Sequence, residues 1–233
     1  MKRRYSLGDQ ETLTREMDYY NKIEGCYEPL SESDYNVILS HLPDSTRASA
    51  ILEVGCGSGA FGQRLERRFA SPLNVGLDVS FNLLCRHPFA PVLGNGQSLP
   101  FQNESFDLIA ASAALHHIHN LPQTLAEMFR CLKPSGRVIF IEPNADHPYR
   151  RIVVDGGFLR DWFLKTTDES VFPTDLVAML QTIGYTNIQF QYVTFQNRRP
   201  SLLGRIQWWI TRPRLPRGLE RFVHAWFVLV SEK

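Results

Sequence analysis

Three glycines within five positions, Gly55, Gly57 and Gly59, follow an apolar run that contains a carboxylate, Glu53. Glycines at such a turn let the backbone come close to a ligand, and a helix that starts there favours anions. The residues also satisfy a dinucleotide-binding pattern, with an acid, Asp78, about 20 residues further on. A carboxylate just before the turn would repel a pyrophosphate and attract an ammonium group. We therefore expect a ligand that carries a cationic amine.

Three histidines, His116, His117 and His119, follow an apolar run at residues 106–112. Histidine is the side chain best suited to accept a proton near neutral pH. If the run is a strand, the histidines lie at the carboxyl edge of a sheet, where ligands of such sheets bind. The sequence therefore predicts a group that can take a proton beside the ligand. The alternative is that one histidine packs beneath the ligand and the others are solvated.

Alternating strand and helix patterns surround these residues. We expect an α/β fold with a mainly parallel sheet that helices cover on both faces. Pro134 and Gly136 stop one helix, while Thr174 is a candidate N-cap and Gly184 a terminator of another. The expected strands are 50–54, 73–79, 90–95, 106–112, 137–143, 187–195 and 222–232, and the expected helices are 61–69, 121–132 and one between Thr174 and Gly184.

Composition is ordinary for a single cytoplasmic domain. The chain has 233 residues, of which 43% are hydrophobic, and can bury an ordinary core. No apolar stretch approaches the roughly 20 residues that span a bilayer, and the N-terminus lacks the apolar region of a secretory signal. The four cysteines include no CxxC pair, which argues against a zinc site and a disulfide framework. We expect neither a metal nor a second domain.

The net charge of +1 gives no reason to expect a nucleic-acid partner, but the charge is uneven. Between Arg198 and Arg221 there are seven arginines and one acid. Residues 201–211, read as a helix, gather leucines, isoleucines and Trp209 on one face. This helix could pack on the protein's own sheet, form a lid over the ligand pocket, or make a weak membrane-surface contact through residues 201–212. The sequence does not predict an oligomeric state.

Four segments resemble the class I S-adenosylmethionine-dependent methyltransferases, and among them the small-molecule type 11 group. The segments are ILEVGCGSGAFG, VGLDVS, GNGQSLPFQNESFDLIAASAALHHIHN and LKPSGRVIFIEPN, in the family's order over residues 50 to 144. The resemblance implies a Rossmann-like methyltransferase fold with a mainly parallel seven-stranded sheet, an antiparallel last strand and a cap over the substrate pocket. The single domain, 1–233, would comprise a core at 48–144, a cap or insert at about 145–172, and a C-terminal helix and strands at 173–233.

The resemblance also implies S-adenosyl-L-methionine as cofactor and S-adenosyl-L-homocysteine as product. Glu53 would help to hold the cofactor's amino group, Asp78 would bind both ribose hydroxyls, and Val79 would flank the adenine. Relatives mostly have an acidic GDAExLPF where this chain has GNGQSLPF, so an amide, Asn95, would accept from the adenine amine, at a cost of about 1 kcal/mol. Alternatively, these polar residues only close a turn. The expected cofactor-binding residues are Glu53, Gly55, Cys56, Gly57, Gly59, Asp78, Val79, Asn95, Gly96, Gln97 and Ser112.

For the reaction, the resemblance implies His117 and Glu142 as catalytic residues. His117 would take the proton of a hydroxyl acceptor, and Glu142 would orient the imidazole. The expected activity is methylation of a small molecule at oxygen, the acceptor being aromatic, glycosylated or otherwise apolar. N- or C-methylation and a lipid or quinone acceptor remain alternatives, as does a non-catalytic scaffold of the same fold. The chain lacks an NPPY-type element after the fourth strand, so methylation of a nucleic-acid base is not expected.

Substrate recognition is expected from segments outside the shared core. Residues 145–172 carry Tyr149, Phe158, Trp162 and Phe163, which would form an aromatic wall or simply pack the cap onto the sheet. The N-terminal segment EMDYYNKIEGCYEPL could supply a further lid, with Tyr19 or Tyr20 close to the cofactor.

Overall fold

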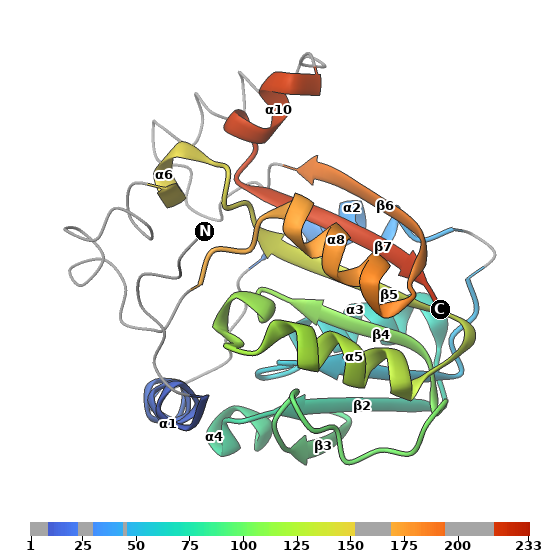
Figure 1. Ribbon diagram of the computed structural model, residues 1–233. Coiled ribbons are helices and arrows are strands. Elements are labelled where there is room, and N and C mark those ends of the chain that lie inside the picture. The colour runs from blue at the N-terminus through green and yellow to red at the C-terminus, as the bar shows by residue number, and fades with distance from the viewer. Residues whose placement is uncertain (1–8, 23–29, 44–45, 152–168, 194–216) are drawn as a thin grey trace.

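A seven-stranded sheet lies at the centre of the computed structural model, which describes residues 9–22, 30–43, 46–151, 169–193 and 217–233 (Figure 1). The strand order is β3-β2-β1-β4-β5-β7-β6. Neighbouring strands pair in parallel, except that β7 is antiparallel to both β5 and β6. The sheet expected from the sequence is confirmed. The strands are β1 (Ala50–Val54), β2 (Leu73–Asp78), β3 (Ala90–Leu93), β4 (Phe106–Ser112), β5 (Leu132–Pro143), β6 (Thr186–Val193) and β7 (Trp226–Glu232).

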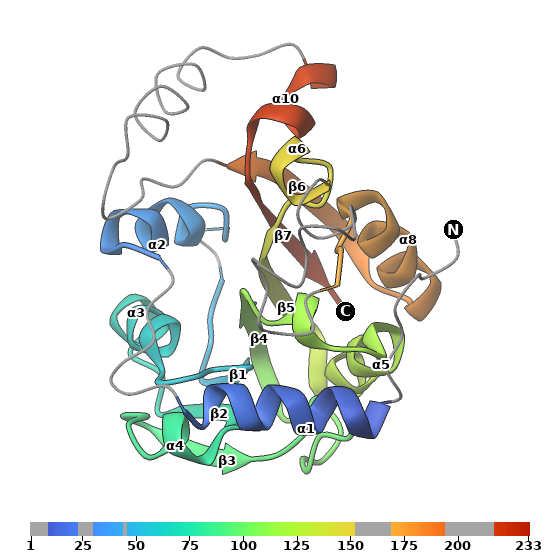
Figure 2. The ribbon, with the colours of Figure 1, turned by 90° about the vertical axis from the view of Figure 1, so that its left-hand side faces the viewer.

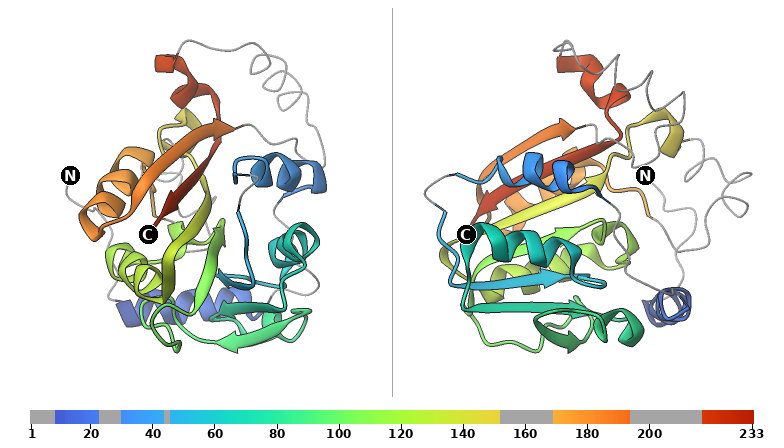
Figure 3. Two further views of the ribbon diagram at one scale, coloured as in Figure 1. Left: turned by 90° about the vertical axis from the view of Figure 1, so that its right-hand side faces the viewer. Right: turned by 180° about the vertical axis from the view of Figure 1, so that it is seen from behind.

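Helices cover both faces of the sheet. Seen along the sheet in Figure 2, α2 and α3 lie on one side and α5 and α8 on the other, and Figure 3 shows the α2 and α3 face from behind. No helix among the described residues is long and apolar enough to cross a bilayer. The helices are α1 (Asp9–Tyr20), α2 (Glu32–Leu39), α3 (Ala60–Phe69), α4 (Phe81–Leu84), α5 (Leu121–Cys131), α6 (Pro148–Arg150), α8 (Pro173–Ile183) and α10 (Arg217–Val223), with a 3₁₀ turn, η1 (Leu115–His117).

Two hydrophobic cores explain why the central strands are mostly apolar. Successive side chains of a strand point to opposite faces, so a strand covered on both faces needs apolar residues throughout. In β1, Leu52 packs into the core beneath α5 and α8, while Ile51 packs into the core beneath α2 and α3. In β5, Phe140 and Ile141 divide in the same way. The sheet is thereby fixed between two layers of helices.

Several element boundaries differ from the sequence-based expectation. Strand β5 begins at residue 132 rather than 137, so Pro134 and Gly136, which were expected to stop the preceding helix, lie within the strand, and α5 ends at Cys131. Helix α8 has Phe172, not Thr174, as its N-cap, because Pro173 lacks an N–H and fits the first helical position. Its end at Gly184 is confirmed, with a left-handed φ of 116°. The last strand begins at residue 226 rather than 222, because Phe222 belongs to α10. The aromatic residues expected at 158, 162 and 163 and the helix expected at 201–211 lie outside the described residues.

The N-terminal helix α1 lies across the edge of the sheet where the parallel strands end (Figure 2). Asn21, which directly follows α1, anchors this helix to the loop between β2 and α4 through hydrogen bonds. Asn21 Oδ1 accepts from Ser80 Oγ at 2.9 Å and from the backbone N–H of Asn82 at 3.3 Å, and the Asn82 amide donates to the Asn21 carbonyl. The helix is therefore placed as a lid over the carboxyl edge.

Candidate active site

A pocket opens at the carboxyl ends of β1, β2 and β4, beneath α1. Its wall consists of the turn after β1, the end of β2, the loop after β3, the loop after β4 and one face of α1. Of the cofactor-binding residues expected from the sequence, all except Gly59 line this pocket. The topology therefore brings together residues that are separated by up to about sixty positions in the sequence, as expected for the edge of a doubly wound sheet.

The glycine turn has a backbone that larger residues would strain. Gly55 and Gly57 have φ values of 70° and 51°, and a Cβ at Gly55 would lie 2.4 Å from that of Ala114. Gly59 is the one glycine of the expected set that does not line the pocket. It caps the start of α3 and packs against His87 and Pro88, where a Cβ would meet ring atoms at 2.7 Å. Gly55 and Gly57 let backbone atoms line the pocket, whereas Gly59 packs against His87 and Pro88 on the other side of the turn.

Glu53 is a buried carboxylate on the pocket wall. Glu53 is 2% exposed, and its Oε2 atom has no hydrogen-bond partner among the residues that the structure describes. Burial raises the pKa of Glu53 to about 8, the nearby charge of Asp78 adds to this, and the Gly62 amide works against it. A buried carboxylate with one oxygen atom that lacks a hydrogen bond is costly and is stabilised by a cation. The site is thus prepared for a cationic group of a ligand.

Asp78 ties the glycine turn to the end of β2. Asp78 Oδ2 accepts the backbone N–H of Gly57 and Oδ1 that of Ser80, each at 2.8 Å. Burial raises the pKa of Asp78, whereas these amides, that of Val79 and the His117 imidazole lower it. Because each carboxylate oxygen can accept two hydrogen bonds, Asp78 retains acceptor capacity for a pair of hydroxyls in the pocket.

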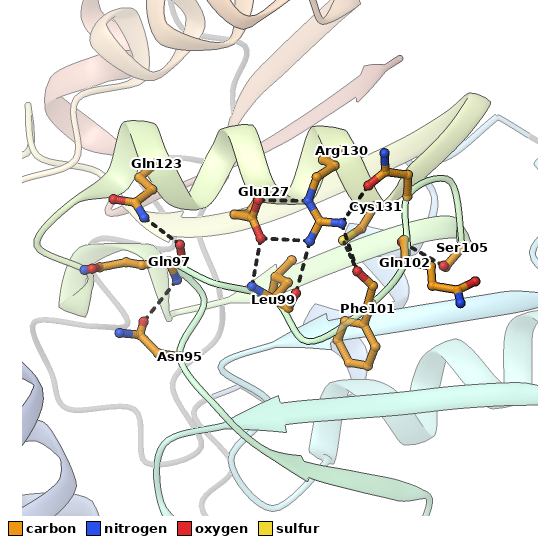
Figure 4. A network of polar contacts seen from close by, with 11 residues as sticks. Asn95, Gln97, Leu99, Phe101, Gln102, Ser105, Gln123, Glu127, Arg130 and Cys131 are labelled. Atoms are coloured by element: carbon orange, nitrogen blue, oxygen red, sulfur yellow. Dashed lines mark hydrogen bonds and ion pairs between the residues drawn. The ribbon is translucent and has the colours of Figure 1, made fainter.

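The loop after β3 forms a turn that also lines the pocket. Asn95 closes a turn, since its Oδ1 accepts the backbone N–H of Gln97 at 3.0 Å, yet Asn95, Gly96 and Gln97 also line the pocket. Figure 4 shows Gln123 of α5 donating to the Gln97 carbonyl, at 2.8 Å. Ser112 also lines the pocket, and its Oγ atom is buried without a hydrogen-bond partner in the described part of the chain.

An ion pair on α5, Glu127 with Arg130, holds the remainder of this loop (Figure 4). Glu127 Oε2 accepts the Leu99 N–H at 2.9 Å, and Arg130 donates to the carbonyls of Leu99 and Phe101 at 3.0 and 2.8 Å. The hydrogen bond from Arg130 lowers the pKa of Glu127. These two residues were not predicted. The sequence pattern that could have indicated them is a Glu and an Arg three positions apart on a helix.

Glu142 contacts His116 and not His117, contrary to the sequence-based expectation. Its Oε2 lies 2.7 Å from His116 Nδ1, and its Oε1 accepts the backbone N–H groups of Ala114 and Leu115 at 2.9 and 2.8 Å. Glu142 is 0% exposed and does not line the pocket. It therefore shapes the turn that carries the histidines and has no direct contact with His117 through these bonds.

His117 lines the pocket and meets two side chains of α1. Tyr20 Oη lies 2.9 Å from His117 Nε2, and Glu16 Oε2 lies 3.4 Å from His117 Nδ1. Of the two tyrosines suggested by the sequence, Tyr20 is the one that lines the pocket. Glu16 was not predicted. The pattern that could have indicated it is the helical spacing of Leu13, Glu16 and Tyr20, which places them on one face.

His119 also lines the pocket and is paired with a different carboxylate, that of Glu169. His119 Nδ1 lies 2.8 Å from Glu169 Oε1, and the Glu169 N–H donates to the His116 carbonyl at 2.7 Å. All three histidines of the cluster are thus paired with acids from different elements. The pocket can hold a ligand with a cationic group and adjacent hydroxyls, and it can take a proton at its rim.

Comparison with known proteins supports this interpretation. Residues 52–140 match the family model described as Methyltransferase domain. A demethylmenaquinone methyltransferase from Symbiobacterium thermophilum is 28% identical over 178 residues, covering 60% of this chain and 70% of that protein. A fatty-acid O-methyltransferase from Mycolicibacterium smegmatis is 34% identical over 147 residues, 54% of this chain and 53% of that protein. The chain thus matches about half the length of the second relative.

The fold is also that of solved methyltransferases. A phosphoethanolamine N-methyltransferase from Haemonchus contortus, solved in complex with S-adenosyl-L-methionine, matches with a TM-score of 0.68 and 14% identity over 99% of this chain and 58% of that chain. At this identity the likeness concerns the fold alone, which agrees with the strand order described above. Residues 52–140 thus match a methyltransferase domain, and the fold of the chain is that of the class I S-adenosylmethionine-dependent methyltransferases.

Proposed function

We propose that the protein transfers a methyl group from S-adenosyl-L-methionine to a hydroxyl of a small apolar acceptor. The observation that carries the proposal is one pocket lined by a buried acid and by a histidine. The acid is Glu53, whose Oε2 atom lacks a hydrogen-bond partner among the described residues, and the histidine is His117, which lies at hydrogen-bond distance from Tyr20. The first suits a cationic cofactor and the second suits an acceptor that must lose a proton.

The residues present fit the cofactor. Glu53 would hold its α-ammonium group, Asp78 its ribose hydroxyls, and Ser112 Oγ offers a buried polar atom that lacks a hydrogen-bond partner within the described ranges. Gly55 lines the same pocket and has no side chain to enter it. When bound, S-adenosylmethionine supplies an activated methyl group, so the protein's own task is to orient the acceptor and to accept its proton.

Two features support an oxygen acceptor of apolar character. A hydroxyl needs a base, and His117 offers one at the pocket rim, whereas an amine lone pair needs none. Apolar side chains, among them Leu13, Tyr35, Phe61 and Ile118, line the pocket. One relative's name, fatty-acid O-methyltransferase, is of this class, while another, demethylmenaquinone methyltransferase, favours a quinone acceptor as the second candidate.

A non-catalytic scaffold would have no use for the charges of this pocket. Keeping Glu53 buried with one oxygen atom that lacks a hydrogen bond from the described residues costs free energy in the absence of a ligand. A protein that only used the fold as a support would be more stable with an apolar residue at that position.

The proposal is tested in two stages. Calorimetry measures the binding of S-adenosylmethionine and S-adenosylhomocysteine to the wild type and to Glu53→Gln, with Asp175→Asn, an exposed change on α8, as the matched control. Incubation with S-adenosylmethionine carrying a labelled methyl group and a panel of phenols, alcohols, quinols and amines follows, with mass spectrometry of the products.

The expected result is binding that Glu53→Gln weakens and Asp175→Asn leaves unchanged, followed by label on an oxygen atom. Absence of cofactor binding by the wild type would overturn the proposal as a whole. Label found on carbon or nitrogen would leave the cofactor assignment standing and overturn the hydroxyl acceptor.

A further inference from the structure

The lid helix α1 presents one face to the pocket. Leu13, Glu16 and Tyr20, at spacings of three and four residues, lie on the same side of a helix and line the pocket together. Glu16 is only 4% exposed, which is unusual for a glutamate. The contacts of this buried acid indicate its role in the pocket.

Both ring nitrogens of His117 face this helix. Nδ1 is the nitrogen that lies 3.4 Å from Glu16 Oε2, and Nε2 is the one that lies 2.9 Å from Tyr20 Oη. The tyrosine ring meets the imidazole edge-on, with centroids 5.5 Å apart and planes at 79°. A carboxylate near Nδ1 favours the tautomer that carries its proton there. Nε2 is then an acceptor, and the Tyr20 hydroxyl donates to it.

The position of α1 is tied to the ribose side of the pocket. Asn21, directly after Tyr20, bonds to Ser80, and the Ser80 N–H in turn donates to Asp78. The lid is therefore attached at the end of β2 and reaches across the pocket to the loop after β4. The position of α1 over the pocket therefore places Glu16 and Tyr20 beside His117.

We propose that Glu16 is the positioning residue of His117 and that Tyr20 passes the acceptor's proton to it, so that α1 completes the base. This inference rests on the proposed hydroxyl acceptor. As the acceptor oxygen bonds to the transferred methyl carbon, whose bond to sulfur breaks with the electron pair left on sulfur, its proton moves to Tyr20 Oη. The Tyr20 proton moves to His117 Nε2. The imidazolium so formed is balanced by the Glu16 carboxylate and later loses its proton to solvent.

Glu16 is not the only titratable group near His117. Asp78 of β2 lies close enough to interact with it electrostatically, and the His116 ring of η1 is 4.0 Å away between centroids. Tyr20 is the third. A test must therefore separate Glu16 from these neighbours, and a change confined to α1 does so because Asp78 and His116 stay in place.

The experiment measures the pKa of the His117 imidazole by NMR in the complex with S-adenosylhomocysteine. Wild type, Glu16→Gln and Glu16→Asp are compared, with Asp18→Asn as the control, since Asp18 is exposed on the same helix. Removing the counter-charge in Glu16→Gln disfavours the imidazolium, so the pKa of His117 should fall by about 1 unit or more. Glu16→Asp should restore part of the shift, and Asp18→Asn should match the wild type.

Turnover of a hydroxyl acceptor provides the second readout. Glu16→Gln and Tyr20→Phe should each lower kcat by about 10-fold or more while cofactor affinity is kept, and the acid limb of the pH profile should move to lower pH in Glu16→Gln. An unchanged pKa of His117 in Glu16→Gln would overturn the role of Glu16. Wild-type turnover retained in Tyr20→Phe would overturn the relay. If the wild type methylated no hydroxyl, the proposed function would fail, while the NMR comparison would still decide whether Glu16 positions His117.

Discussion

The Glu142 carboxylate lies 2.7 Å from His116 Nδ1 inside the protein, while the adjacent His117 turns toward α1. The same carboxylate accepts the backbone N–H groups of Ala114 and Leu115. Three donors therefore converge on one fully buried acid. Glu142 holds the backbone of the η1 turn in place and thereby determines where His117 lies, although it does not contact the pocket.

We predict that Glu142→Gln destabilises the fold. The amide keeps one acceptor oxygen, but its NH₂ group must face a donor, which leaves buried polar groups unsatisfied. The expected loss is about 1–3 kcal/mol in the free energy of unfolding, measured by chemical denaturation. Asp175→Asn, at an exposed carboxylate, should change it little. Wild-type stability in Glu142→Gln would show that the three bonds are not essential to the turn.

Glu53 should make stability depend on pH. Its pKa in the folded protein is about 8, above the usual 4.5, so the folded state holds more protons between these values. The contribution of this group is favourable at low pH and is lost as pH rises through about 8. Glu53→Gln cannot ionise, so it should be more stable than the wild type at about pH 9, with a smaller difference at about pH 5. Thermal unfolding of the ligand-free proteins across this range measures the effect.

Cofactor binding should be coupled to the same proton. A bound ammonium group favours the carboxylate form of Glu53, so binding below about pH 8 releases a proton and affinity rises as pH increases toward that value. Calorimetry in buffers of different ionisation enthalpy measures the released proton. Glu53→Gln should abolish the buffer dependence. A release that persists in the variant would assign the proton to another group.

Gly62 is expected to be a glycine because of Glu53. A Cβ at position 62 would lie 2.8 Å from Glu53 Oε2, although alanine is favoured over glycine inside a helix such as α3 by about 1 kcal/mol. Gly62→Ala should therefore displace the carboxylate and weaken cofactor binding. In a Glu53→Ala background the same change should stabilise the protein by about 1 kcal/mol. A double-mutant cycle of unfolding free energies tests this sign reversal.

Asp78→Ala should weaken the binding of S-adenosylmethionine and of S-adenosylhomocysteine alike. The variant loses the charged acceptor for the ribose hydroxyls, a cost of roughly 1.5–3 kcal/mol. It also loses the bonds to Gly57 and Ser80, which hold the turn. Calorimetry measures both ligands. Unchanged affinity, or tighter binding of a nicotinamide dinucleotide than of S-adenosylmethionine, would argue against this cofactor site.

Local patterns account for the parts of the molecule that sequence could predict. The strands at 50–54 and 106–112 are mostly apolar and almost entirely buried, as two cores require, and they occur as expected. The glycine turn is encoded within a few residues, and so is its place at the end of β1. Because parallel strands end at one edge, the pocket residues after each strand could be grouped without knowledge of their contacts.

The contacts that sequence did not predict depend on long-range geometry. Glu16 and His117 are about a hundred positions apart, and the amphipathic pattern of α1 does not say which pocket it faces. Glu142 was expected to orient His117, but neighbouring residues of a short 3₁₀ turn point in different directions, and His116 is the one directed inward. Tertiary packing determines which side chain points inward, and this cannot be predicted from the spacing of residues in the sequence.

His117 and His119 both line the pocket, so replacing each separately identifies the base. If His117 takes the proton, His117→Ala should lower turnover of a hydroxyl acceptor by about 10²–10⁴-fold and leave cofactor affinity nearly intact. His119→Ala should have the smaller effect, because the His119 imidazole is paired with Glu169, whereas Tyr20 lies at hydrogen-bond distance from His117.

The pH dependence of turnover distinguishes this mechanism from alignment alone. A rising limb near the ordinary histidine pKa of about 6.5 is expected in the wild type and should disappear in His117→Ala. An acceptor that is already nucleophilic, such as an amine or a phenolate, needs no base, and its methylation should survive the His117→Ala change. Hydroxyl turnover and a pH limb that both persist in His117→Ala would remove this residue from the mechanism. Loss of both in His119→Ala, with His117→Ala active, would transfer the role to His119 and its partner Glu169.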